Sequence, residues 1–105
     1  MQLENKVSIV TGAARGLGRA YAEALAGAGS AVLACDVNDC SETVEAILRD
    51  GGQAVSTTVD STDIASCKAM AKVALASFGR IDVLVNNAAL YGGLKGARFD
   101  LLEEA

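Results

Sequence analysis

A glycine-rich stretch, Thr11 to Gly18, constrains the fold of this chain more than any other segment. It follows an apolar run typical of a buried strand, Val7 to Val10, and precedes an amphipathic helical pattern. Its three glycines let the backbone turn sharply and approach a ligand without Cβ atoms in the way. The helix that follows directs its unpaired N–H groups and the positive end of its dipole at the stretch. The arrangement predicts a pocket for the pyrophosphate of a dinucleotide.

Strand-like and helix-like segments alternate four times along the 105 residues, with short connections. We predict strands at residues 6–11, 31–35, 53–59 and 81–85. This alternation is typical of a parallel sheet with right-handed crossovers. We therefore predict one α/β domain over residues 1–105. It would be a Rossmann-type doubly wound parallel sheet, truncated after its fourth strand, with the strand order 3-2-1-4 and ligands at the carboxyl ends of the strands.

Apolar residues recur at helical spacing in three segments, which predicts three amphipathic helices. The expected buried face of the first comprises Leu17, Ala20, Tyr21, Ala24, Leu25 and Ala28. That of the second comprises Cys40, Val44, Ile47 and Leu48. That of the third comprises Ile64, Cys67, Ala71, Ala74, Leu75 and Phe78. We expect Thr62 or Asp63 to cap the third helix and Gly79 to end it.

Composition and charge limit the classes of partner. Apolar residues make up 51% of the sequence but aromatic residues only 4%, so Ala, Val, Leu and Ile must build the core. The net charge is −4 and Lys and Arg form no run, so we expect neither nucleic acid nor a membrane as a partner. Cys35, Cys40 and Cys67 have no metal-binding spacing and the chain has no His. We expect no metal site, and three reduced thiols in a cytoplasmic protein.

An acidic residue, Asp36, follows the second predicted strand. A carboxylate in this position can accept hydrogen bonds from the hydroxyls of an adenosine ribose. It would also repel a 2′-phosphate, which favours NAD over NADP as the cofactor. Arg15 is the one residue that argues against this preference for NAD. A guanidinium in the phosphate loop can bind a 2′-phosphate, or it can remain solvated at the start of a helix.

These residues resemble the short-chain dehydrogenase/reductases. The resemblance rests on the Gly12-xxx-Gly16-x-Gly18 spacing, on Asp60 after the third strand, and on Asn-Asn-Ala-Ala at 86–89 after the fourth. It covers essentially the whole chain but only the first half of the family's length. It implies the N-terminal, NAD(P)-binding part of a longer domain. The function it implies is hydride transfer between a nicotinamide and an alcohol or carbonyl substrate.

The resemblance also implies roles for individual residues. Gly12, Gly16 and Gly18 would shape the pyrophosphate pocket, with Leu17 packed nearby, and Asp36 would bind the adenine ribose.

Further positions after the third and fourth predicted strands complete the implied cofactor site. Asp60 would lie beside the adenine amino group, with the backbone N–H of Ser61 next to it. Asn86 would brace the central strands, and Asn87, Ala88 and Ala89 would line the cofactor cleft. The chain departs from the family's pattern in two small ways, with Ser61 where an apolar residue is common and Ala89 where Gly is common.

The family's catalytic Ser, Tyr and Lys belong to the half that this sequence does not contain, so we expect the chain alone to be inactive. Tyr91 and Lys95 have the spacing of the family's Tyr-x-x-x-Lys pair. The two glycines between them oppose a helix by roughly 2 kcal/mol, so we assign them no catalytic role.

Two alternatives remain open at this point: a non-catalytic dinucleotide-binding module and a fragment without function. An alcohol or carbonyl substrate would bind only to a full-length form. A sheet that ends at its fourth strand exposes that edge, so we also expect a tendency to self-association.

Overall fold

The computed structural model describes residues 2–60 and 62–87. Its elements are β1 (Val7–Thr11), α1 (Gly16–Gly27), β2 (Ala31–Asp36), α2 (Ser41–Arg49), β3 (Gln53–Thr58), α3 (Ile64–Phe78) and β4 (Val83–Asn86). All four predicted strands are present. β4 begins later than predicted, after Asp82, whose carboxylate accepts a hydrogen bond from the Val7 N–H at 2.8 Å.

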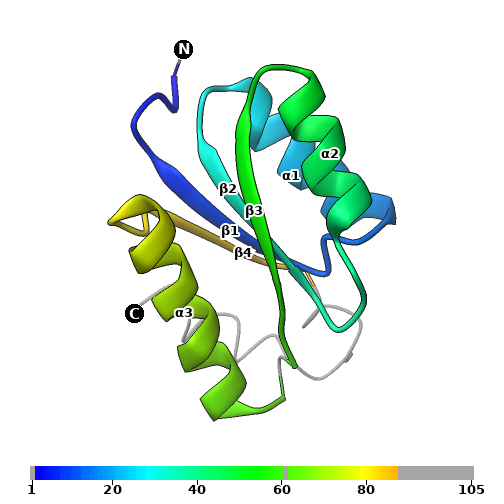
Figure 1. Cartoon of the computed structure of the whole chain (residues 1–105), viewed down its shortest axis with the longest axis vertical. Helices are drawn as coiled ribbons and strands as arrows, with labels where there is room; N and C mark the ends of the chain where they lie inside the picture. Colours follow the sequence, from blue (N-terminus) through cyan, green and yellow to red (C-terminus); the bar gives the residue numbers. More distant parts are fainter. Residues whose placement is uncertain (1, 61, 88–105) are drawn as a thin grey trace.

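The four strands form one parallel sheet in the order β3-β2-β1-β4, which confirms the predicted topology (Figure 1). The central strand β1 pairs with β2 on one side and β4 on the other, and Thr11 at its end lies opposite both Cys35 and Asn86. The carboxyl ends of these strands therefore meet at one edge of the sheet. Within the described residues β4 pairs with β1 alone.

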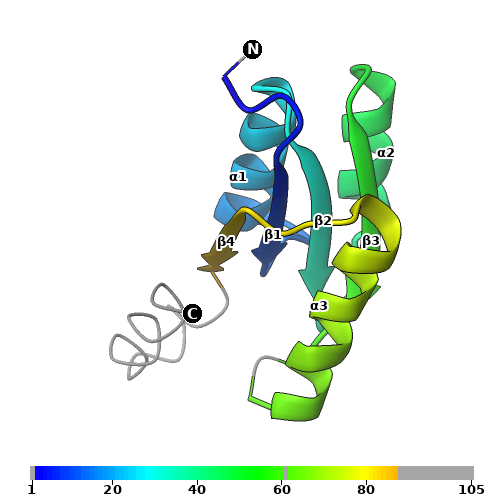
Figure 2. The same cartoon turned by 90° about the vertical axis from the view of Figure 1, so that its left-hand side faces the viewer.

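Helices cover both faces of the sheet, with α1 and α2 on one face and α3 on the other (Figure 2). Successive strand residues alternate between the two faces. Val10 and Val32 pack with α1 and α2, whereas Ile9 and Leu33 pack with α3. Both cores consist mainly of small and medium aliphatic side chains, as the composition predicts, with Cys35, Cys40 and Met70 among them.

The predicted buried face of α1 is mostly wrong, with Leu25 the member of it that packs against the core. Gly18 and Ala22 are its buried residues, with Leu25 and Ala26 partly buried beside them. Leu17 and Tyr21 are 52% and 37% exposed, and Ala20 and Ala24 are exposed too. The helix turns its smallest residues toward the sheet because this lets its first turn approach the end of β1 closely.

The predicted faces of α2 and α3 are partly wrong. In α2 the buried residues include Thr43 besides Ile47, and Leu48 is exposed. In α3 Met70 and Ala74 are buried, whereas Ile64 and Leu75 are exposed. In each of these two helices one large apolar side chain, Ile47 or Met70, packs into the core, while other large apolar residues of the predicted face are exposed.

The ends of α3 agree with the sequence. The Asp63 carboxylate accepts a hydrogen bond from the Ala65 N–H at 2.9 Å, and Gly79 ends the helix with a left-handed φ of 83°.

No helix among residues 2–60 and 62–87 has the length and apolar character needed to cross a membrane. The predictions for Ser61, Ala88, Ala89 and residues 91–95 lie outside the described residues.

Candidate functional site

The glycine loop between β1 and α1 needs its glycines for two different reasons. Gly12 and Gly16 have φ values of 67° and 62°, a backbone conformation that side-chain-bearing residues rarely adopt. Gly18 lies within α1, and there the space is limiting. A Cβ atom on Gly18 would overlap the carbonyl oxygen of Gly12 and lie 2.9 Å from Asn87 Nδ2.

The amino-terminal end of α1 has no side-chain cap. Arg15 occupies the N-cap position with an extended backbone, its side chain is exposed, and no acidic residue stands in the first turn. Next to it, a Cβ atom on Gly16 would meet no atom within 4 Å. Without a side-chain cap, the first N–H groups of the helix remain available to an anion.

Asp36, at the end of β2, lies directly beside this loop. Its Oδ2 accepts a hydrogen bond from the Ala14 N–H at 3.0 Å, and its Oδ1 accepts one from the Asn38 N–H at 3.1 Å. One main-chain bond, from the Ala13 N–H to the Cys35 carbonyl oxygen at 2.9 Å, also joins the loop to β2. Oδ1 also accepts a bond from Asn38 Nδ2 at 3.5 Å, whereas Oδ2 has one donor and retains acceptor capacity. The half-buried Asp36 is therefore oriented and can still accept a hydrogen bond from a hydroxyl.

Two asparagines at the end of β4 reach the same place. The Thr11 hydroxyl donates to Asn86 Oδ1 at 2.9 Å, and both side chains are buried. This bond ties β1 to β4, in agreement with the bracing role expected for Asn86. The buried Asn87 donates from Nδ2 to the Gly12 carbonyl oxygen at 3.5 Å, so the end of β4 contacts the glycine loop itself.

Asp60 follows β3 at the same edge of the sheet. The Val59 N–H donates to the Asp36 carbonyl oxygen at 2.9 Å, which holds the end of β3 against the end of β2. The carboxylate of Asp60 is exposed and accepts bonds from the Thr62 hydroxyl and N–H at 2.6 and 3.0 Å. These bonds hold the pKa of Asp60 below its ordinary value. The two predicted acidic residues thus follow adjacent strands.

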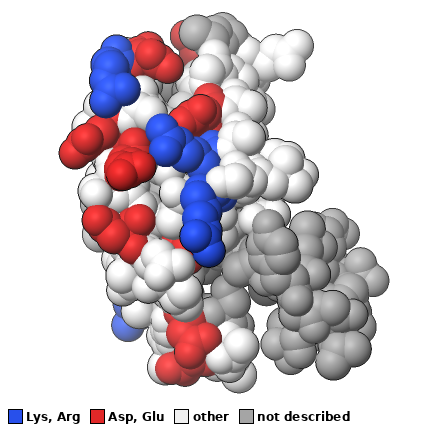
Figure 3. Space-filling view, turned by 90° about the vertical axis from the view of Figure 1, so that its right-hand side faces the viewer, with Lys and Arg blue, Asp and Glu red and all other residues white. Residues whose placement is uncertain are grey.

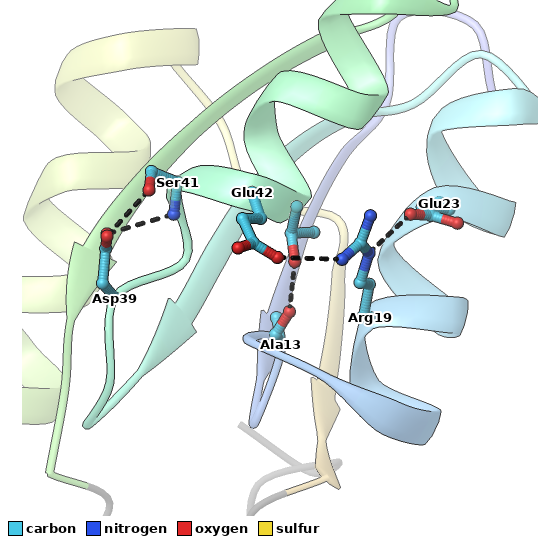
Figure 4. A network of polar contacts seen from close by, with 7 residues as sticks. Ala13, Arg19, Glu23, Asp39, Ser41 and Glu42 are labelled. Carbon is cyan, nitrogen blue, oxygen red and sulfur yellow. Dashed lines mark hydrogen bonds and ion pairs between the residues drawn. The ribbon is translucent and has the colours of Figure 1, made fainter.

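Contacts of two residues around the loop and α1 are not evident from the sequence. The buried Thr43 hydroxyl donates to the Ala13 carbonyl oxygen at 2.7 Å (Figure 4). Arg19 of α1 forms ion pairs with Glu23 at 2.9 Å and with Glu42 of α2 at 3.6 Å. The signal for Thr43 is its position among Cys40, Val44 and Ile47 on an apolar face, where a polar residue requires a partner.

Charges on the face that α1 and α2 form are of both signs and lie interspersed (Figure 3). At the loop, the main-chain N–H groups at the start of α1 are the groups that can attract an anion, with the exposed Arg15 beside them. Together with the oriented carboxylate of Asp36, these groups fit a ligand that carries a diphosphate and a ribose diol. A dinucleotide is such a ligand.

Comparison with known proteins gives a family match over nearly the whole chain. Residues 6–104 match the family model described as short chain dehydrogenase. An uncharacterised oxidoreductase of Mycobacterium tuberculosis is 50% identical over 94 residues, which cover 88% of this chain and 38% of that protein. Galactitol 2-dehydrogenase of Agrobacterium fabrum is 42% identical over 91 residues, 87% of this chain and 35% of that protein.

The fold comparison agrees with the sequence comparison. The crystal structure of hydroxysteroid dehydrogenase from Escherichia coli superimposes with a TM-score of 0.79 and 36% identity. The match covers 81% of this chain and 37% of that one. The chain thus spans less than two fifths of the length of these relatives.

Proposed function

The chain belongs to the short-chain dehydrogenase family, and we propose that it is the NAD-binding part of an oxidoreductase. The reaction is hydride transfer between the nicotinamide and an alcohol or carbonyl substrate. A bound NAD supplies the hydride acceptor or donor, and this chain's residues bind and orient it. The names of the relatives include a sugar-alcohol dehydrogenase and a hydroxysteroid dehydrogenase, so we commit to the alcohol or carbonyl class and to no single substrate.

One observation supports this proposal most strongly: the first turn of α1 has no side-chain cap, and at Gly18 it lies too close to the glycine loop for a side chain to fit between them. We assign the diphosphate to the loop formed by Gly12, Gly16 and Gly18 and to the N–H groups at the start of α1. Leu17, half exposed in the first turn, lies where it can contact the cofactor. Arg15 is exposed at the same end and is placed to meet a phosphate by charge alone.

The carboxylate of Asp36 is the basis for proposing NAD rather than NADP. It is fixed by the Ala14 and Asn38 N–H groups at the carboxyl edge of the sheet. There it can accept a hydrogen bond from a ribose hydroxyl, and its negative charge would repel a 2′-phosphate. The Arg15 guanidinium opposes this preference, but it belongs to the N-cap of α1 and not to the end of β2.

The remaining assignments complete the cofactor site. We propose that Asp60 and Ser61 contact the adenine, and that Asn87, Ala88 and Ala89 line the cleft toward the nicotinamide. We propose a cytoplasmic protein whose partners are the dinucleotide and a small substrate. The groups that transfer protons to the substrate are assigned to no residue of this chain.

Titration of the 105-residue chain with NADH, followed by cofactor fluorescence, tests the proposal. We expect saturable binding that Asp36→Ala weakens by about tenfold or more, because a charged hydrogen bond to the ribose is lost. Asp50→Ala is the matched control, since Asp50 is an exposed carboxylate beyond the other end of α2. Absence of saturable binding by the folded wild-type chain would contradict the proposal.

A further inference from the structure

The peptide group between Ala13 and Ala14 is held at both of its ends by side chains from other elements. Its carbonyl oxygen accepts the 2.7 Å bond from Thr43 in the first turn of α2. Its N–H donates the 3.0 Å bond to Asp36 at the end of β2. The peptide is trans, so its C=O and N–H point in opposite directions, and the two bonds together fix its orientation.

The buried hydroxyl of Thr43 is used in the hydrogen bond to the Ala13 carbonyl oxygen. The residue is 0% exposed and lies on the apolar face of α2, where an unpaired hydroxyl would be costly. A threonine within a helix commonly donates back to the preceding turn of its own helix. Here the hydroxyl instead reaches thirty residues back along the sequence to the glycine loop.

The direction of the loop's carbonyl groups matters for an anion. A carbonyl oxygen turned toward a phosphate would repel it, whereas an N–H would attract it. The Gly12 carbonyl is directed at Asn87 Nδ2 and the Ala13 carbonyl at Thr43 Oγ1. Both carbonyl oxygens are therefore bonded to protein donors, and no side chain caps the N–H groups at the start of α1.

We propose that Thr43 is a positioning residue for dinucleotide binding. Its hydroxyl holds the Ala13–Ala14 peptide in the orientation that the binding loop needs. This inference rests on the proposed function and extends it to a residue that has no exposed surface and so cannot touch the cofactor. When the Thr43 donor is removed, the buried Ala13 carbonyl loses its partner and the peptide can rotate. Rotation moves the Ala14 N–H away from Asp36, which loosens the glycine loop and the ribose-binding carboxylate together.

The first test compares two substitutions at Thr43 by NADH titration of the chain. Thr43→Val keeps the shape and removes the hydroxyl, and we expect about 5- to 10-fold weaker binding. Thr43→Ser keeps the hydroxyl, and we expect binding within about twofold of wild type. Equal weakening by the two variants, or wild-type affinity of Thr43→Val, would overturn the proposal.

A matched control removes a buried hydroxyl elsewhere in the molecule. Ser30 bonds Ser8 at 2.7 Å, beside the amino-terminal ends of β1 and β2 and away from the loop. In Ser30→Ala, measured where circular dichroism shows all variants folded, we expect NADH affinity within about twofold of wild type. Weakening as large as that of Thr43→Val would assign the effect to general destabilisation and contradict a positioning role.

A second readout does not depend on cofactor binding. In the unliganded chain we expect the Ala14 amide to exchange its proton about 5- to 10-fold faster in Thr43→Val than in wild type or Thr43→Ser. If the wild-type chain binds no NADH, the proposed function fails, and this exchange rate still decides whether Thr43 holds the loop. Unchanged exchange in Thr43→Val would refute that role. Thr43→Ala provides a second hydroxyl-free variant if Thr43→Val does not fold.

Discussion

Gly18, in the first turn of α1, lies so close to Gly12 that a Cβ atom on Gly18 would overlap the Gly12 carbonyl group. The same atom would come within 2.9 Å of the buried Asn87 side chain. The carbonyl belongs to a loop that Asn87, Thr43 and Asp36 already hold, so it cannot move aside freely. The start of α1, the loop after β1 and the end of β4 therefore meet at Gly18.

Gly18→Ala should destabilise the chain and weaken dinucleotide binding at the same time. The added methyl group must push α1 away from the loop, which we expect to lower the free energy of unfolding by about 1–3 kcal/mol. Urea unfolding followed by circular dichroism measures this change.

Gly27→Ala is the control in the same helix. A Cβ atom on Gly27 would meet nothing within 4 Å and its φ is not left-handed, so we expect a gain of about 0.5–1 kcal/mol. Similar unfolding midpoints for Gly18→Ala and Gly27→Ala would contradict the close approach at Gly18.

The strand order and the position of the loop could be predicted from the sequence because they depend on local signals. Apolar runs of strand length alternate with helical spacing, and Gly12, Gly16 and Gly18 stand at one junction between them. The parallel order 3-2-1-4 follows from right-handed crossovers once these elements are assigned. Asp36 could be placed at the site because it ends a strand next to β1 in that order.

The helix faces could not be predicted as well, because periodicity does not reveal how closely a helix approaches the sheet. In α1 the large residues Leu17 and Tyr21 share a face with helical spacing, yet the buried face carries Gly18 and Ala22. The close contact between Gly18 and the Gly12 carbonyl determines which face of α1 is turned toward the sheet. That contact depends on the conformation of the glycine loop, which the periodicity of the sequence does not reveal. The burial of Thr43 could not be predicted for a related reason. A polar side chain is expected to be exposed unless it has a buried partner, and the partner of Thr43, the Ala13 carbonyl, is known only from the structure.

The three cysteines should differ in reactivity. Burial raises the pKa of the Cys35 thiol to about 12 and that of the Cys40 thiol to about 11. Cys67 is only partly buried. With Ellman's reagent at about pH 8, where thiolates react, we expect Cys67 to be modified first in the folded chain. All three should react at similar rates in urea, and rapid reaction of Cys35 in the folded state would be inconsistent with its buried position.

Stability should fall at alkaline pH. Since the pKa values of Cys35 and Cys40 are raised in the folded state, the unfolded chain loses these thiol protons first as the pH rises above about 9. The folded state therefore loses stability between the ordinary thiol pKa and about 11 to 12. Urea midpoints measured from pH 8 to 10.5 should decline more steeply for wild type than for the Cys35→Ala/Cys40→Ala double variant. If the urea midpoints of the two proteins fall in parallel with pH, these thiols do not contribute to the loss of stability at alkaline pH.

The most direct test of the account is an NMR titration of the ¹⁵N-labelled chain with NAD⁺. The dinucleotide should cause saturable shifts of the amide signals of Ala14, Gly16, Leu17 and Gly18, the N–H groups beside Asp36 and at the start of α1. Signals at the opposite end of the sheet, such as those of Gly29 and Gly51, should stay in place. No saturable shift in the folded chain, or shifts centred away from the glycine loop, would contradict the assignment of the loop as a dinucleotide site.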